Sequence, residues 1–160
     1  DYKNKLKYAG KWKFGIYAMG EMLPRYENQV SLHANLKDKW GIPQLNIECE
    51  FSNNETLMME DAAEQGAKML TRIGLKNVTS SVSHGDPGLG IHEIGTARMG
   101  RDPKSSFLNG YNQSHDVPNL FVADGSSLCS SATQNPSLTF MALAARAVDY
   151  AVKEMDARRI

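Results

Sequence analysis

The sequence has little cysteine, no long hydrophobic run and no excess of one charge. Its two cysteines, Cys49 and Cys129, lie far apart and show no CxxC or Cys/His spacing, which argues against a disulfide framework and a zinc site. Lysine plus arginine number 18, as do aspartate plus glutamate, so charge gives no case for nucleic acid or an anionic membrane. The apolar runs fall far short of the roughly 20 residues of a membrane helix. We therefore expect no nucleic-acid partner, no metal site and no membrane span.

The composition is that of an ordinary globular domain. The chain has 160 residues, of which 41% are hydrophobic and 22% charged, and this is enough material for one core. It begins with Asp1 rather than methionine, so we expect a fragment or processed product whose localisation stays unknown.

The first half predicts an antiparallel hairpin. Apolar and polar residues alternate over 30–37 and again over 44–51, on either side of a turn that contains Gly41 and Pro43. The alternation is typical of half-buried strands and places Cys49 inside. The residues over 14–22 also predict a third strand. This pattern is weaker, because Gly15 and Gly20 interrupt it.

A helix is predicted to cover this sheet. Ser52 or Asn53 can cap a helix over about 53–73, and Gly74 is suited to end it. A further strand is predicted over 78–83.

The second half has the pattern of an α/β fold. The apolar run 119–123 predicts a buried strand that stops at Asp124, and a serine-rich loop follows to Gln134. Asn135 is predicted as the N-cap of a helix over 136–156 with Pro136 in its first position. Apolar residues recur at spacings of three and four along this helix and predict a core face: Leu138, Met141, Ala145, Val148, Val152 and Met155.

Three motifs in the second half carry a family resemblance. They are residues 90–100 (GIHEIGTARMG), 119–126 (NLFVADGS) and 135–139 (NPSLT). In this order they resemble the C-terminal signature of the glucose-methanol-choline (GMC) oxidoreductases: HxxGTxRMG, NLFVxDxS and NPxxT. The resemblance is detailed from His92 to about residue 150 and weaker before it. Within the family, the motifs are nearest the pyranose oxidase and bacterial sugar dehydrogenase branch.

The resemblance implies a fold between α+β and α/β in two parts. Residues 1–92 would form the family's substrate-binding domain, an antiparallel sheet with a covering helix. Residues 93–160 would supply the C-terminal strand and helix of a Rossmann-like FAD-binding domain, which is incomplete in this chain. The GxGxxG turn that holds a dinucleotide is absent from the sequence, so we expect the N-terminal FAD-binding part of a parent chain as partner and an isolated fragment that is inactive.

The resemblance also implies catalytic roles for His92 and Asn135. The histidine would take the proton of a substrate hydroxyl while the substrate carbon gives hydride to flavin N5, and Asn135 would be the second residue of the active-site pair. Both roles suit the side chains, because a neutral imidazole accepts protons near neutral pH and an amide can orient an alcohol oxygen.

The same comparison implies contacts with FAD. Asp124 and Gly125 would lie against its pyrophosphate and ribityl parts, while Asn135, Pro136 and Ser137 would lie at the ring. The helix that follows would direct its N-terminal N–H groups and positive dipole potential toward charge on the reduced ring. Taken alone, His92 is an ordinary surface histidine, Asn135 a helix cap and Asp124-Gly125 a turn.

The expected activity is that of the parent protein. It would oxidise a CH–OH group of a sugar, glycoside or related alcohol, with oxygen, a quinone or an electron-acceptor protein receiving the electrons. The alternative is a non-catalytic module that binds carbohydrate or protein and retains the motifs as relics. A third possibility is a structural or electron-transfer subunit.

Overall fold

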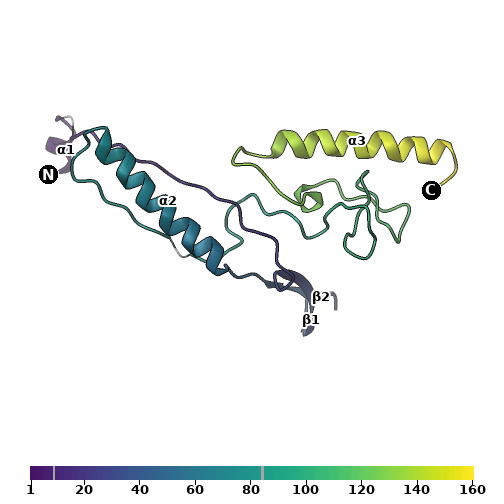
Figure 1. Ribbon diagram of the computed structural model, residues 1–160. Coiled ribbons are helices and arrows are strands. Elements are labelled where there is room, and N and C mark those ends of the chain that lie inside the picture. The colour runs from purple at the N-terminus through teal and green to yellow at the C-terminus, as the bar shows by residue number, and fades with distance from the viewer. Residues whose placement is uncertain (9, 84) are drawn as a thin grey trace.

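The computed structural model describes residues 1–8, 10–83 and 85–160. In Figure 1 a long helix lies toward each end of the molecule, with a hairpin and extended loops between and beneath them. The elements in chain order are α1 (Tyr2–Lys5), β1 (Gln29–Lys37), β2 (Pro43–Glu48), α2 (Asn53–Arg72), a 3-10 turn η1 (Gly125–Ser127) and α3 (Ser137–Asp156).

The predicted hairpin is confirmed as an antiparallel pair. Val30 pairs with Ile47 and Leu32 with Leu45, and the Asp38 carboxylate stabilises the turn by accepting hydrogen bonds from the N–H groups of Trp40 and Ile42 at 2.8 and 2.9 Å. The predicted burial is wrong. Leu45 and Ile47 are 65% and 70% exposed, because no helix in the described part of the chain packs broadly over this sheet. Cys49 is half-buried.

The helix predicted over 53–73 is present as α2. Ser52 is its N-cap and forms a capping box with Glu55, whose carboxylate accepts a hydrogen bond from the Ser52 N–H at 2.7 Å. At the other end Gly74 has φ +87°, and the N–H of Leu75 donates to the Leu70 carbonyl, as in a Schellman motif. The caps explain both ends, but α2 does not cover the sheet.

Three predicted strands are not formed. Residues 14–22 and 78–83 are extended without a hydrogen-bonded partner strand, and 119–123 makes one isolated antiparallel bridge between Phe121 and Gln113. A strand is stable only when a neighbouring strand pairs with its backbone. The described residues supply no such neighbour for 14–22 and 78–83, and for 119–123 they supply only the short stretch 112–114.

The predicted C-terminal helix is present as α3, but its cap and its core face differ from the prediction. The N-cap is Pro136 rather than Asn135, and no side chain caps the first turn. The predicted core face is exposed, with Leu138 78%, Met141 68% and Val148 61% accessible. The opposite face packs instead: Ala147 is 1% exposed, and Tyr150 stacks on Tyr111 at 4.2 Å between ring centroids.

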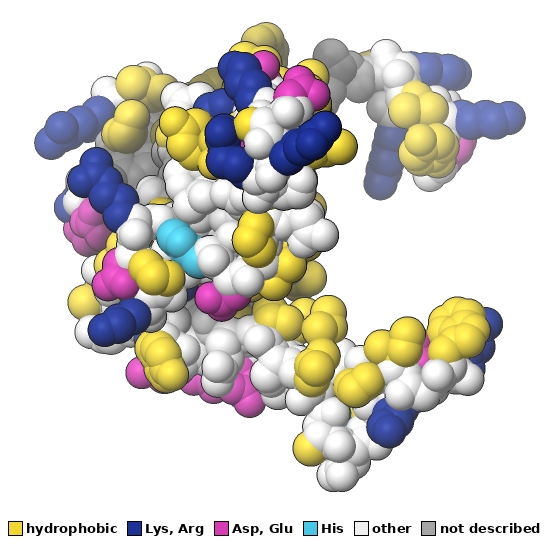
Figure 2. Space-filling view, turned by 90° about the vertical axis from the view of Figure 1, so that its right-hand side faces the viewer, with side chains coloured by type: hydrophobic (Ala, Val, Ile, Leu, Met, Phe, Trp, Pro, Cys, Tyr) yellow, Lys and Arg dark blue, Asp and Glu magenta, His cyan; other side chains and the backbone are white. Residues whose placement is uncertain are grey.

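The hydrophobic core of this chain is very small. Among the described residues the buried apolar side chains are Leu70, Leu108 and Ala147, together with Pro136. The accessible surface is 13067 Å², whereas a compact monomer of this mass has about 8,000 Å². Figure 2 shows hydrophobic side chains spread over a hollowed surface. The expectation of one globular core within these residues is therefore wrong.

Candidate functional site

The first and second motifs lie side by side. The N–H of Ala97 donates to the Ser126 carbonyl at 3.1 Å, and that of Met99 donates to the Ser127 carbonyl at 2.9 Å. Gly95 begins this pairing with φ +92°, a conformation that favours glycine. The backbone that follows His92 is therefore fixed against the turn that follows Asp124.

Helix α3, which begins within the third motif, joins them through Gly125. A Cβ at this position would lie 2.8 Å from Cζ of Phe140, which belongs to the first turn of α3. Gly125 therefore lets the helix approach the turn closely. This packing accounts for the glycine by itself, and the predicted contact of Gly125 with FAD stays a prediction.

Asp124 organises the turn itself. Its carboxylate accepts a hydrogen bond from the Ser126 N–H at 2.9 Å, and its carbonyl accepts one from the Ser127 hydroxyl at 2.8 Å. The side chain is the N-cap of η1 and is exposed. The structure therefore shows a turn-forming role for Asp124.

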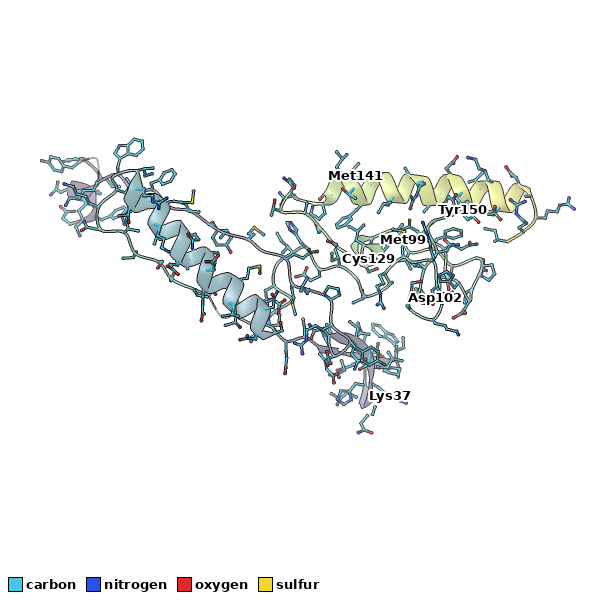
Figure 3. The ribbon with its side chains drawn as sticks, in the orientation of Figure 1. Lys37, Met99, Asp102, Cys129, Met141 and Tyr150 are labelled. Carbon is cyan, nitrogen blue, oxygen red and sulfur yellow. The ribbon has the colours of Figure 1, made fainter. Side chains whose placement is uncertain are left out.

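A buried polar centre, which the sequence reasoning missed, holds α3 over these loops. Asn112 is fully buried with φ +62°, and its amide donates to the Val122 carbonyl at 2.9 Å. Arg146 of α3 reaches the Asn112 side-chain oxygen at 3.4 Å and the Met99 sulfur at 3.6 Å. Figure 3 shows Met99 beneath α3, with Tyr150 on the same side of the helix. The turn-forming stretch Asn109-Gly110 was the available signal for this centre.

The serine-rich loop is held at two points before Asn135. The Cys129 thiol donates to the Met99 carbonyl at 3.2 Å. Glu21, from the first half of the chain, accepts hydrogen bonds from the Ser130 hydroxyl at 2.6 Å and the Ser131 N–H at 3.0 Å. The Ser130 bond, and then the Ser131 bond, lowers the pKa of Glu21 below its ordinary value of 4.5.

The two predicted catalytic side chains are not joined in the described structure. His92 is half-buried, Asn135 is exposed, and no hydrogen bond connects them. Neither lines the open cavity of about 510 Å³ beneath α3. That cavity is lined by Met99, Gly100, Arg101, Asn109, Gly110, His115, Leu128, Thr139, Leu143 and Arg146.

The start of α3 has the chemistry that a negatively charged group requires. Pro136 cannot donate a hydrogen bond, and the N–H groups of Ser137, Leu138 and Thr139 donate to no other described residue. Because the helix dipole adds positive potential at the same end, this turn fits the electronegative edge of a flavin. Asn135, Pro136 and Ser137 lie at this turn, and their contact with FAD stays a prediction.

The described residues form neither a metal site nor a membrane-spanning helix. No group of three or more histidine, cysteine, aspartate or glutamate residues there is arranged to hold a metal ion. No helix there is long and apolar enough to cross a membrane.

Comparison with known proteins identifies the family. The family model described as GMC oxidoreductase matches residues 24–144. The 2-methyl-1,2-propanediol dehydrogenase of Mycolicibacterium austroafricanum is 36% identical over 84% of this chain and 24% of its own length. The fructose dehydrogenase large subunit of Gluconobacter japonicus is 28% identical, over 88% of this chain and 25% of its own length.

An oxidase shows the same partial coverage. The pyranose 2-oxidase of Lyophyllum shimeji is 25% identical over 74% of this chain and 19% of its own length. The chain thus spans a quarter or less of the curated relatives it matches. The match of the family model over most of the sequence shows that this chain belongs to the GMC oxidoreductase family.

Proposed function

We propose that this chain is the C-terminal quarter of an FAD-dependent oxidoreductase that oxidises a CH–OH group of a sugar, glycoside or related alcohol. The observation that carries the proposal is the convergence of the first two motifs with the first turn of α3: Ala97 and Met99 pair with the turn after Asp124, and Gly125 lies against Phe140. The relatives named above, which include a diol dehydrogenase and two sugar-directed enzymes, support the substrate class.

His92 is proposed to accept the proton of the substrate hydroxyl. A neutral imidazole is a suitable acceptor near neutral pH, and Gly95 fixes the backbone three residues on. Asn135 is proposed to hold the hydroxyl oxygen by its side-chain amide, so that the O–H points at the imidazole. The chemistry that FAD would supply when bound is that of a hydride acceptor.

The N-terminal turn of α3 is proposed to stabilise negative charge on the ring. Its three N–H groups donate to no described residue and are fixed in direction by the helix. Donors that are already oriented need no rearrangement as charge develops. Asp124 and Gly125 are proposed to lie near the pyrophosphate and ribityl parts of FAD.

The remainder of the binding site is proposed to lie in the N-terminal part of the parent protein. The exposed apolar face of α3 and the accessible surface of 13067 Å² both support a large covering partner. Residues 1–92 are proposed as the substrate-binding part and 93–160 as the last portion of the FAD-binding domain. On this arrangement the chain alone holds no complete active site.

The test is anaerobic reduction of the flavin in the full-length protein. The protein is purified with its cofactor and mixed with a panel of sugars, glycosides, diols and simple alcohols, while the absorbance of the oxidised flavin is followed. Bleaching by one class of hydroxyl compound is expected and would identify the substrate. A protein that binds no FAD, or a flavin that no alcohol reduces, would contradict the proposal and favour a non-catalytic binding module.

A further inference from the structure

Glu21 stands out because it joins the two halves of the chain. Among the described residues, the two hydrogen bonds that its carboxylate accepts are the only ones between residues 1–83 and residues 93–160. Their donors, the Ser130 hydroxyl and the Ser131 N–H, lie 2.6 and 3.0 Å away. A carboxylate that accepts two hydrogen bonds holds its partners more firmly than a neutral acceptor does.

The segment that carries Glu21 is itself fixed to α2. Two residues later the N–H of Leu23 donates to the Glu55 carboxylate at 3.2 Å, within the capping box of the helix. One residue earlier Gly20 lies under Met58 of α2, where an added Cβ would be 2.5 Å from the Met58 Cε. The segment that contains Glu21 is therefore held against α2 by contacts on both sides of Glu21.

The loop that Glu21 holds leads directly to Asn135. Between Ser131 and Pro136, no described residue is hydrogen-bonded to another part of the chain. On the far side the next fixed bond is the first of α3, from the Phe140 N–H to the Pro136 carbonyl at 3.0 Å. The course of the four residues Ala132 to Asn135 is therefore set by Glu21 at one end and α3 at the other.

We infer that Glu21 is a positioning residue for the active site. It connects the capped start of α2 in the first half to the serine-rich loop in the second, and so sets the course of the loop that leads to Asn135. The inference rests on the proposed function for the role of Asn135, but the tether itself does not depend on a flavin. Glu21 touches neither substrate nor cofactor in this account.

The test compares Glu21→Ala with Glu21→Gln in the full-length protein, and Glu27→Ala serves as the matched control. Glu27 is an exposed acid six residues further on that, among the described residues, forms an ion pair with Arg25 alone. Amide hydrogen exchange is measured over residues 129–135, together with the limiting rate of anaerobic flavin reduction at saturating substrate. The melting temperature is recorded for every variant.

Loss of both bonds in Glu21→Ala is expected to speed exchange of the Ser131 amide, the backbone donor to Glu21, roughly tenfold while exchange elsewhere and melting stay unchanged. The limiting rate should fall roughly 10- to 100-fold, the effect expected when a reacting group is displaced. Glu21→Gln keeps an acceptor oxygen and should recover part of both losses. Glu27→Ala should match the wild type in both measurements.

Three results would overturn the inference: unchanged exchange in Glu21→Ala, an equal rise in Glu27→Ala, or faster loop exchange with a wild-type reduction rate. If Glu21→Ala does not fold, Ser130→Ala removes one donor from an exposed position and should give a smaller rise in loop exchange. A wild-type protein that lacks FAD would refute the proposed function, while the exchange measurement would still test the tether.

Discussion

Glu55 is the most strongly perturbed acid in the molecule. It is 1% exposed, and hydrogen bonds from the Ser52 hydroxyl, which outweigh its desolvation, lower its pKa to about 2 from an ordinary 4.5. The Leu23 and Ser52 N–H groups also donate to it. Stability from this group is therefore complete above about pH 4.5 and is lost as the pH falls toward about 2.

Glu55→Gln is predicted to reduce this acid sensitivity. The variant should be less stable than the wild type at neutral pH, by roughly 1–3 kcal/mol for a buried cap with lost partners. The difference should narrow between about pH 4.5 and 2, where wild-type Glu55 takes up its proton. Urea unfolding of the full-length protein at several pH values measures this difference in the free energy of unfolding between wild type and variant. Glu60→Gln, an exposed position on the same helix, should show no such narrowing.

Gly125 gives a second test at the scale of one residue. Gly125→Ala places a Cβ 2.8 Å from the Phe140 ring and should displace α3 from the turn after Asp124. We expect a loss of roughly 1–3 kcal/mol in stability, as for overpacking, measured by urea unfolding. Combining it with Phe140→Leu should recover part of that loss. If Gly125→Ala lowers stability equally with and without Phe140→Leu, the close contact between Gly125 and Phe140 is not the cause of the loss.

At the scale of elements, sequence patterns predicted correctly the elements that depend on interactions between residues close in sequence. The hairpin and α2 were predictable, because alternation and capping residues such as Ser52 act over a few positions. The strands over 14–22, 78–83 and 119–123 were not formed, since a strand requires a partner that the sequence pattern cannot supply. The Asn112 and Arg146 centre was missed because it joins residues that are far apart in the sequence.

The two faces of α3 should respond differently to charge. Ala147 is 1% exposed and Val148 is 61% exposed. In this chain alone, Val148→Asp should leave the helical circular dichroism unchanged, whereas Ala147→Asp should reduce it. In the full-length protein both should destabilise, Val148→Asp by roughly 2 kcal/mol or more because an unpaired charge becomes buried. A full-length protein that tolerates Val148→Asp would show that nothing covers this face.

At the scale of the whole molecule, the excess of surface is the dominant feature. An area of 13067 Å², against about 8,000 Å² for a compact protein of this mass, leaves too little burial for strong cooperativity. We therefore predict that the chain alone unfolds over a broad range and binds a hydrophobic dye. Adding the separately produced N-terminal part with FAD should sharpen the melting curve. A sharp, dye-free transition of the chain alone would contradict this.

The site was partly predictable at this scale as well. The sequence singled out the three motifs by their family resemblance, and in the structure Ala97 and Met99 of the first motif pair with the turn after Asp124 at the end of the second. The side-chain geometry of His92 and Asn135 was not predictable, because both lie on loops whose final positions depend on groups outside the motifs. Glu21, which lies more than 100 residues from the loop it holds, carries no motif.

The most direct test of the central claim is the rate of anaerobic flavin reduction in full-length His92→Ala. The account predicts a rate slower by roughly 100-fold or more, as expected for loss of a general base, with FAD still bound and with partial recovery on addition of imidazole. His33→Ala, a histidine in the hairpin, should reduce its flavin at the wild-type rate. A His92→Ala protein whose flavin is reduced as fast as the wild type would contradict the account.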